Sequence, residues 1–304
     1  MKTKSRIIIY IVAIFIFLLI ITSTTFASTL KVDGSEGYTK IQQALNNATV
    51  GDTVLVYPGT YIENIYIDKE LVLTAESENP ADTIIQAARA EEHILDIKAN
   101  GVTIKGFTIK DARGPEKAGI YLDSVEKCNI SNNVLSNNQN GIGLASSTGN
   151  VLIDNNIVSS RWIGIYLERS NDNLLDNNSM VLNNWDGITL EASNNNELKN
   201  NGINSNNKNG VSLISSNNNR INNNTIDSNN AIGIFMDMSV NNTLNDNSLS
   251  NNSKAINKEG YIENHIYDNY IVDREVPETS FINSTLTAFI IGIAFIFVRT
   301  SQKL

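Results

Sequence analysis

A short motif recurs six times at an almost constant interval: glycine, then Ile or Val, any residue, and Leu or Met. The motifs begin at Gly119, Gly141, Gly164, Gly187, Gly210 and Gly233, so the first step is 22 residues and the others are 23. Each period contains three short apolar pieces, and none has the length or the 3.6-residue spacing of a helix. Strands this short cannot bury a face alone, so each copy must stack on the next.

Two further apolar columns follow the same interval. One consists of Ile130, Ile153, Leu175, Leu198, Ile221, Leu244 and Ile266; the other consists of Leu135, Val158, Met180, Ile203, Ile226, Leu249 and Ile271. Three strands per period predict an all-β coil of parallel strands, with coils about 4.8 Å apart, the strand-to-strand distance in a sheet. The stacked Ile, Leu and Val side chains would fill its interior.

Asparagine stands two residues before every member of the second of these columns. The positions are Asn133, Asn156, Asn178, Asn201, Asn224, Asn247 and Asn269. The chain has 47 asparagines, and 41 of them lie between residues 129 and 269. We expect this column to form a ladder of side-chain amides bonded from coil to coil. Cys128 aligns with the interior Val151 and is expected to be a small core residue.

Both ends of the chain carry long apolar runs. Basic residues precede Ile7–Ile21, and a small-x-small pattern ends at Ala27, which predicts a signal peptide over residues 1–27. An uncleaved signal anchor is the alternative. The run Phe281–Val298 has no charge and is followed by basic residues. It predicts a transmembrane helix whose basic tail stays in the cytoplasm, so the body of the chain would lie outside the cell.

Between these runs we expect a cap and a coil. Residues 28–60 form the N-terminal cap, residues 61–275 form the parallel β-helix, and residues 276–304 hold the anchor and its tail. A short amphipathic helix over Thr39–Ala48 would cover the open apolar end of the coil. The residues on its apolar face are Ile41, Ala44, Leu45 and Ala48.

Charge and composition exclude some partners. With 23 basic and 32 acidic residues, the net charge is −9. Such a balance argues against nucleic acid, because phosphate binding needs a basic face. One cysteine and two histidines argue against a dedicated soft-metal site. His93 and His265 have no partners in sequence and are expected to be ordinary side chains.

Outward-facing residues beside the glycine motif suggest a carbohydrate-binding face. Side chains alternate along a strand, so the residues two and four positions after each glycine point outward. From these positions the predicted binding residues are Tyr121, Asp123 and Tyr166. Trp162 and Trp185, which lie two residues before a glycine, and the neighbouring Asp186 complete the predicted set. Sugar rings stack on aromatic faces, and carboxylates accept hydrogen bonds from hydroxyls. The alternative is a set of solvated acids and two edge aromatics.

Two acidic pairs suggest further chemistry. Glu168 and Glu191 would lie about 5 Å apart, near the separation of the carboxylates in retaining glycosidases, and are candidate catalytic residues. Asp154 and Asp176 each follow an interior residue by one position, so they are expected to stack one coil apart. Stacked carboxylates repel unless a cation lies between them, and calcium is the candidate. No other cofactor is expected.

Seven Asn-x-Ser/Thr sequons occur in the chain. They begin at Asn47, Asn129, Asn177, Asn223, Asn241, Asn251 and Asn283. Such sequons arise by chance in an asparagine-rich chain, but exposed ones can carry a glycan. Asn129 precedes a core isoleucine and is expected to face outward.

The segments Tyr38–Leu45 and Gly51–Ile67, together with the asparagine-rich repeats, resemble NosD-type right-handed parallel β-helix proteins over residues 30–275. The resemblance implies a single right-handed coil. The wider pectin-lyase-like group includes polysaccharide lyases, hydrolases, epimerases and non-enzymatic surface proteins. NosD itself is associated with copper delivery to nitrous oxide reductase. The tripeptide Val276-Pro277-Glu278 is similar to archaeal surface-sorting signals.

Three functions remain open. The favoured one is a membrane-anchored extracellular protein of the cell surface that binds carbohydrate or builds the envelope. The others are a polysaccharide lyase, glycosidase or epimerase, and a NosD-like copper accessory. Every coil from residue 119 to residue 271 has 22 or 23 residues, which leaves no long loops to wall a catalytic cleft. The expected partners are an extracellular polysaccharide or envelope glycan and, through the C-terminal helix, the membrane.

Overall fold

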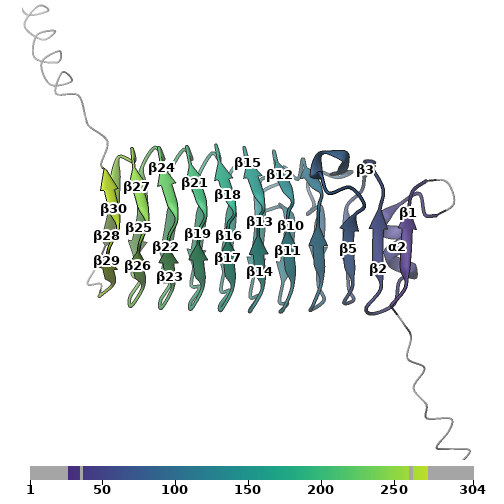
Figure 1. The fold of residues 1–304 in the computed structure, drawn as a ribbon, viewed down its shortest axis with the longest axis horizontal. Coiled ribbons are helices and arrows are strands. Elements are labelled where there is room, and N and C mark those ends of the chain that lie inside the picture. The colour runs from purple at the N-terminus through teal and green to yellow at the C-terminus, as the bar shows by residue number, and fades with distance from the viewer. Residues whose placement is uncertain (1–26, 35–36, 260–262, 273–304) are drawn as a thin grey trace, which may run out of the picture.

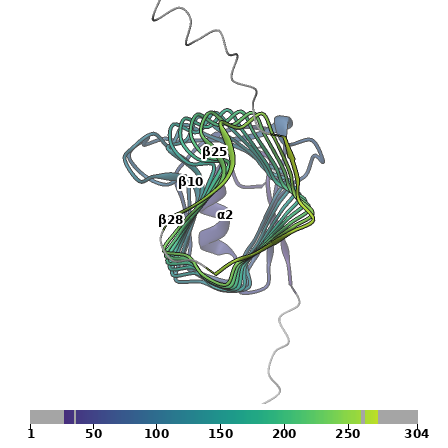
Figure 2. The same cartoon turned by 90° about the vertical axis from the view of Figure 1, so that its left-hand side faces the viewer.

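Three parallel sheets run the length of one right-handed coil, as the repeat predicts (Figure 1). The computed structural model describes residues 27–34, 37–259 and 263–272. Seen along its axis, the coil has one closed outline on which successive turns superimpose (Figure 2). The prediction of an all-β parallel β-helix with three strands per coil is therefore confirmed.

The strands fall into sheets A, B and C. Sheet A stacks β1 (Thr29–Val32), β2 (Thr53–Val56), β5 (Val72–Ala75), β8 (Thr103–Lys105), β11 (Asn129–Ser131), β14 (Val151–Ile153), β17 (Leu174–Asp176), β20 (Glu197–Lys199), β23 (Arg220–Asn222), β26 (Thr243–Asn245) and β29 (His265–Tyr267). Sheet B stacks β3 (Gly59–Ile62), β6 (Thr83–Gln86), β9 (Thr108–Lys110), β12 (Val134–Ser136), β15 (Asn156–Val158), β18 (Ser179–Val181), β21 (Gly202–Asn204), β24 (Thr225–Asp227), β27 (Ser248–Ser250) and β30 (Tyr270–Val272). Sheet C stacks β4 (Ile65–Ile67), β7 (Leu95–Ile97), β10 (Ala118–Asp123), β13 (Asn140–Ala145), β16 (Ile165–Glu168), β19 (Ile188–Glu191), β22 (Val211–Ile214), β25 (Ile232–Asp237) and β28 (Lys254–Glu259).

One coil differs in register from the expected alignment. Leu152, not Ile153, stacks on Ile130, and Ile157, not Val158, stacks on Leu135. The short 22-residue step therefore falls one coil earlier than expected in these two columns. Both candidates at each position are apolar, so the sequence pattern does not distinguish them. A slip of one residue moves a side chain to the opposite face, and Ile153 accordingly lies on the outside.

The expected amide ladder is present, with Asn155 in place of Asn156. From Asn155 onward, each ladder asparagine uses Oδ1 to accept the backbone N–H and the Nδ2–H of its counterpart in the preceding coil. The ladder consists of Asn133, Asn155, Asn178, Asn201, Asn224, Asn247 and Asn269. It lies at the turn between sheets A and B.

Further ladders line other turns of the described coil. One consists of Asn150, Asn173, Asn196, Asn219, Asn242 and Asn264. Another consists of Asn183, Asn206, Asn229 and Asn252. Serine hydroxyls form a fourth, with Ser147, Ser170, Ser193, Ser216 and Ser239. Buried Cys128 aligns with Asn150, not with Val151, because its N–H donates to Asn150 Oδ1.

In the ladder between sheets A and B, a residue in the left-handed region precedes each ladder asparagine, which explains many of the Asn-Asn pairs. The φ angles of Asn177, Asn200 and Asn223 are 53°, 57° and 53°. Asparagine tolerates this region better than most side chains. The turn thus selects asparagine twice, once for its backbone conformation and once for its buried amide.

Helix α2 (Ile41–Asn47) lies at the N-terminal end and buries Ile41, Ala44 and Leu45 against the first strands. The parallel stack already includes β1 and β2, which belong to the segment 28–60 that we expected to be the cap. No helix of the described residues is long and apolar enough to cross a membrane. The predicted signal peptide and the predicted transmembrane run lie outside those residues.

Asn201→Leu should destabilise the coil. The amide of Asn201 bonds Asn178, Asn224 and the carbonyl of Leu175, and its Oδ1 also accepts the buried backbone N–H of Asn178. Leucine removes all of these bonds and leaves that N–H without its acceptor. We expect the free energy of unfolding to fall by about 1–3 kcal/mol in urea denaturation. Asn207→Leu, at an exposed asparagine of the same coil, is the control and should change little. Equal stability of the two variants would show that the ladder contributes nothing.

Candidate functional site

The outer face of sheet C carries a hollow one coil wide. Tyr121, Gly143 and Tyr166 pair in register on β10, β13 and β16. The middle coil therefore presents no side chain between two tyrosines. Adjacent strands lie about 4.8 Å apart, so the outer two are separated by roughly 10 Å. A Cβ at Gly143 would lie 3.1 Å from the Tyr121 ring, so even alanine would crowd this floor.

Two upstream segments wall this hollow. His93 comes from the segment between β6 and β7, and Glu116 and Lys117 come from the segment between β9 and β10. We call it the sheet C hollow. It has a volume of about 380 Å³ and is lined by His93, Glu116, Lys117, Ala118, Tyr121, Asn140, Gly143, Trp162, Tyr166 and Glu168.

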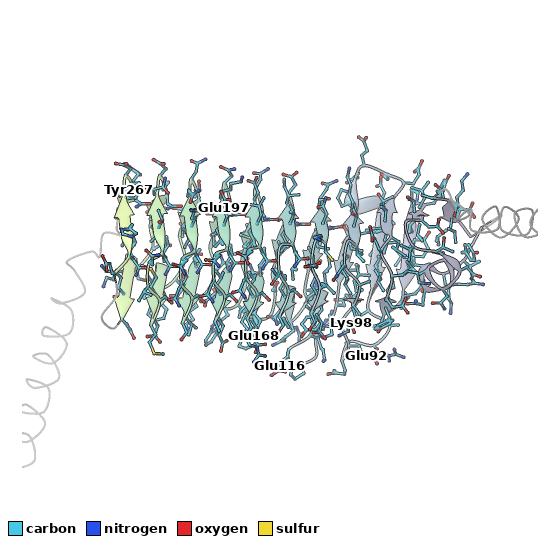
Figure 3. The ribbon with its side chains drawn as sticks, turned by 90° about the horizontal axis from the view of Figure 1, so that it is seen from below. Glu92, Lys98, Glu116, Glu168, Glu197 and Tyr267 are labelled. Carbon is cyan, nitrogen blue, oxygen red and sulfur yellow. The ribbon has the colours of Figure 1, made fainter. Side chains whose placement is uncertain are left out.

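A second hollow of about 310 Å³ adjoins the first and shares His93 and Lys117 with it. Its lining includes Arg89, Glu92 and Asp96. Figure 3 shows Glu92, Lys98, Glu116 and Glu168 on one side of the coil, whereas Glu197 and Tyr267 of sheet A lie on the opposite side. The two hollows make a groove across β4 to β16.

His93 is held as a neutral hydrogen-bond donor. Its ring stacks on Tyr121 with the centroids 4.0 Å apart, and its Nδ1 accepts the backbone N–H of Ala118 at 3.0 Å. Burial and the charges of Lys117 and Lys98 lower the pKa of His93 to about 4. The proton therefore resides on Nε2 at neutral pH. Burial also raises the pKa of Tyr121, so its phenol stays protonated.

Lys98 forms ion pairs with the carboxylates of Asp96 and Asp123, beside the stacked rings of His93 and Tyr121. Its Nζ lies 2.5 Å from Asp123 and 3.3 Å from Asp96, and it is 5.6 Å from the centre of the Tyr121 ring. The hydrogen bond from Lys98 lowers the pKa of Asp123. Burial raises the pKa of Asp96. This cluster fixes Tyr121 and Asp123 in place at the edge of the sheet C hollow.

Of the two tryptophans, only Trp162 contributes to the sheet C hollow. Trp162 lines the sheet C hollow, whereas Trp185 is 41 % exposed and lies outside its lining. The two rings meet edge to face with centroids 6.5 Å apart. The Lys208 ammonium lies 3.9 Å from the centre of the Trp185 ring, so a cation already occupies a face of that side chain.

Asp186, which the sequence predicts as a binding residue, is buried in the structure. It is only 3 % exposed. Its carboxylate accepts hydrogen bonds from the N–H of Asn209 and from the hydroxyls of Ser212 and Thr189. Burial raises its pKa. The alternating pattern predicts only which strand residues face outward, and Asp186 lies in the turn before the strand.

Glu168 and Glu191 are register partners on β16 and β19, as expected. Glu168 forms an ion pair with Arg169 at 2.6 Å. Glu191 accepts a hydrogen bond of 2.6 Å from the hydroxyl of Tyr166, and burial together with this bond raises the pKa of that tyrosine. Of the two acids, only Glu168 lines the sheet C hollow.

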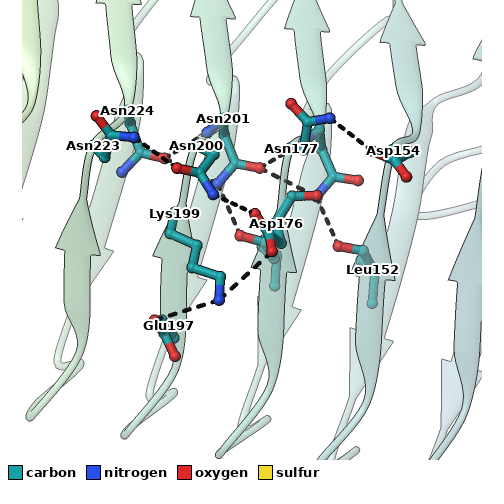
Figure 4. Close-up of polar contacts among 12 residues, drawn as sticks. Leu152, Asp154, Asp176, Asn177, Glu197, Lys199, Asn200, Asn201, Asn223 and Asn224 are labelled. Atoms are coloured by element: carbon teal, nitrogen blue, oxygen red, sulfur yellow. Dashed lines mark hydrogen bonds and ion pairs between the residues drawn. The ribbon is translucent and has the colours of Figure 1, made fainter.

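Asp154 and Asp176 do not stack, contrary to the expected calcium pair. Asp176 pairs in register with Ile153. Figure 4 shows that each carboxylate accepts a hydrogen bond from an asparagine amide, Asp154 from Asn177 and Asp176 from Asn200. The cause is again the early 22-residue step. Within the described residues, no three His, Cys, Asp or Glu side chains are grouped so that they could hold a metal ion.

The upstream residues of the groove were not predicted as site residues. The sequence predicts an ordinary side chain at His93 and does not single out Lys98, Glu116 or Lys117. The sequence feature that could have indicated these residues is the greater length of the upstream coils. Leu73 and Ile104 are stacking partners 31 residues apart, and Ile104 and Ile130 are partners 26 residues apart. These longer coils supply the walls that the regular coils after Gly119 lack.

Sequence comparisons identify related chains. A family model described as periplasmic copper-binding protein (NosD) matches residues 45–208 and again residues 163–278. A cell surface glycoprotein of Methanothermus fervidus is 35 % identical over 127 residues, which cover 40 % of this chain and 20 % of that protein. The match thus spans about a fifth of the length of this relative.

Several solved structures share the fold. An alginate lyase from Paenibacillus sp. str. FPU-7 aligns with a TM-score of 0.63 and 13 % identity over 82 % of this chain and 98 % of that one. The Dettilon tailspike protein gives 0.62 and 16 % identity, with 74 % and 51 % covered. The A-module of the Azotobacter vinelandii mannuronan C-5 epimerase AlgE4 gives 0.53 and 13 % identity, with 77 % and 90 % covered. At these identities the likeness shows the fold alone.

His93→Asn should reduce the acid sensitivity of the coil. The unfolded imidazole has a pKa near 6.5, and the folded one about 4, so between these values only the unfolded chain binds the proton. The free energy of unfolding of the wild type therefore falls as pH falls through this window. Asparagine keeps an acceptor near the Nδ1 position and does not titrate. Urea unfolding at pH 7.0, 5.5 and 4.5 measures the difference; parallel curves for the two proteins would contradict the assignment.

Proposed function

The chain belongs to the NosD family, and from this membership and the groove on sheet C we propose that it is an extracellular β-helix protein that binds a polysaccharide. The family is described as periplasmic, and the Methanothermus relative is named a cell surface glycoprotein. Both descriptions place such proteins outside the cytoplasm. The predicted signal peptide and the predicted anchor Phe281–Val298 agree with this location.

The observation that carries the proposal is the sheet C hollow. Its bare floor at Gly143 lies between the aromatic rings of Tyr121 and Tyr166, with Trp162 beside them. Aromatic rings offer apolar faces to the C–H groups of a sugar, and Glu168, Asn140 and Lys117 offer polar partners to its hydroxyls. We infer that this hollow is the principal sugar subsite.

The groove continues beyond one subsite. The adjoining hollow lies over β4 and β7 and places Arg89, Glu92 and Asp96 along the same face. A chain of sugars that runs along the coil axis would cross successive strands of sheet C. This geometry favours an extended polymer over a single small molecule.

Catalysis is the second candidate function, and the register pairing of Glu168 and Glu191 is what favours it. Their backbones are one strand spacing apart, about 4.8 Å. Retaining glycosidases use two carboxyl groups about 5–5.5 Å apart, one as acid and one as nucleophile. Glu191 lies outside the lining of the sheet C hollow, which favours binding over hydrolysis.

The family description also names copper, but the described residues do not fit a copper site. Copper prefers imidazole and sulfur ligands. Cys128 is buried, and His93 uses Nδ1 to accept a backbone N–H. His265 lies on β29, near the other end of the coil. We therefore derive no copper step for this chain.

Tyr121→Ala and Trp162→Ala should each weaken glycan binding. Each removes an aromatic platform, which corresponds to roughly a tenfold loss of affinity. A glycan array probed with the full chain identifies the ligand, and titration of each variant with that glycan measures the loss. Phe235→Ala is the matched control, because Phe235 occupies the same outward column as Tyr121 and Tyr166, on β25. Normal binding by both hollow variants, or an equal loss in the control, would contradict the site.

Glu168→Gln and Glu191→Gln separate binding from catalysis. A binding protein should tolerate the neutral amides, with affinity changed less than tenfold. A glycosidase should lose nearly all turnover while it still binds, because one carboxyl must donate a proton and the other must attack. The measurement is release of reducing ends from the array-selected glycan. Turnover by the wild type that both variants lack would overturn the non-catalytic proposal.

A further inference from the structure

Four of the seven sequons begin directly before a ladder asparagine, at three different turns of the coil. Each begins at an exposed asparagine with positive φ, continues with a buried ladder asparagine, and ends with a Ser or Thr at a position that is not buried. The first asparagines are Asn177, Asn223, Asn241 and Asn251, with φ angles of 53°, 53°, 58° and 53°. The turn geometry of the coil therefore accounts for the paired asparagines of these sequons, and the Ser or Thr that follows each pair completes the acceptor motif.

This turn has the properties of an acceptor for N-linked glycan. The middle residue points into the coil, so the asparagine before it and the hydroxyl residue after it both lie on the outside. The Nδ2 of Asn177 donates one hydrogen bond of 2.7 Å to Asp154, and the Nδ2 of Asn223 donates one of 2.7 Å to Asn200. An amide nitrogen carries two hydrogens. A glycosylated amide keeps one of them, so each of these bonds can persist after modification.

We propose that Asn177 and Asn223 carry N-linked glycans; the proposal rests on the extracellular location argued above. The donor would be a lipid-linked oligosaccharide phosphate. A bond forms between the sugar C1 and Nδ2, the bond from C1 to the phosphate oxygen breaks, and the amide proton passes to the released phosphate. No other co-reactant is required.

The two positions suit bulky groups. Both lie at the turn between sheets A and B, after β17 and β23, and two coils separate them, roughly 10 Å. Sheet C, with its groove, forms the remaining wall of the coil. Glycans at this turn would therefore cover the corner away from the groove and leave the binding face open.

Asn200 provides an internal control. It lies between the two proposed sites at the same turn, with a φ of 57° and the same exposed position before a ladder asparagine. Gly202 occupies the third position of the tripeptide that begins at Asn200, and glycine has no hydroxyl. Asn200 should therefore remain unmodified, although its environment matches that of Asn177 and Asn223.

To test this, the full chain is expressed in a host that glycosylates exported proteins. One version keeps its own N-terminus and the other follows an export signal of the host. Both versions carry an appended reporter sequon that the host is known to modify. Mass spectrometry of glycopeptides should find glycan on Asn177 and Asn223 and none on Asn200. Ser179→Ala and Thr225→Ala should each remove one glycan, and Gly202→Thr should add one at Asn200. Bare Asn177 and Asn223 on exported chains whose reporter sequon is modified would overturn the proposal. Glycosylation only behind the host signal would support the acceptor turn and contradict the extracellular location.

Discussion

The coil depends on one repeated interaction, in which a ladder asparagine accepts two hydrogen bonds from its counterpart in the preceding coil. Asn201 Oδ1, for example, accepts the N–H and Nδ2–H of Asn178 at 2.9 and 3.1 Å. Each sharp turn directs a backbone N–H into an interior without water, where an unpaired polar group costs several kcal/mol. The amide satisfies that group, and its own Nδ2 bonds a carbonyl. The turns are therefore stable only when equivalent coils stack in register.

This dependence divides the molecule into two parts. Where the ladders run, an inserted residue would break several bonds at once, so the coils keep a constant length and a flat exterior. Upstream of Asn133 the first ladder has no earlier asparagine, and the coils reach 26 and 31 residues. The sheet C hollow lies at the junction, because the irregular coils supply its walls and the regular coils supply its aromatic floor.

The sequence predicted the architecture well because periodic burial is a strong signal, and it failed where neighbouring residues are chemically alike. Leu152 and Ile153, or Asn155 and Asn156, fit a column equally, and only hydrogen-bond register distinguishes them. Strand alternation placed Tyr121 and Tyr166 on the outer face. It gives no prediction for Asp186, because that residue lies in a turn. It also gives none for His93, because the position of His93 depends on the long segment between β6 and β7, which lines the sheet C hollow.

Because side chains alternate along each strand, the residues that stabilise the coil differ from the residues on its outer face. Ladder amides and apolar columns point inward, whereas the floor of the hollow and the sequon asparagines point outward. A substitution of a side chain on the outer face therefore leaves the ladder bonds intact. Gly143 is an exception, because its missing side chain makes the floor and also leaves space for the Tyr121 ring. The regular interior thus allows the exterior of each coil to vary, and one coil with no side chain at this position is enough to leave a hollow in the outer face of sheet C.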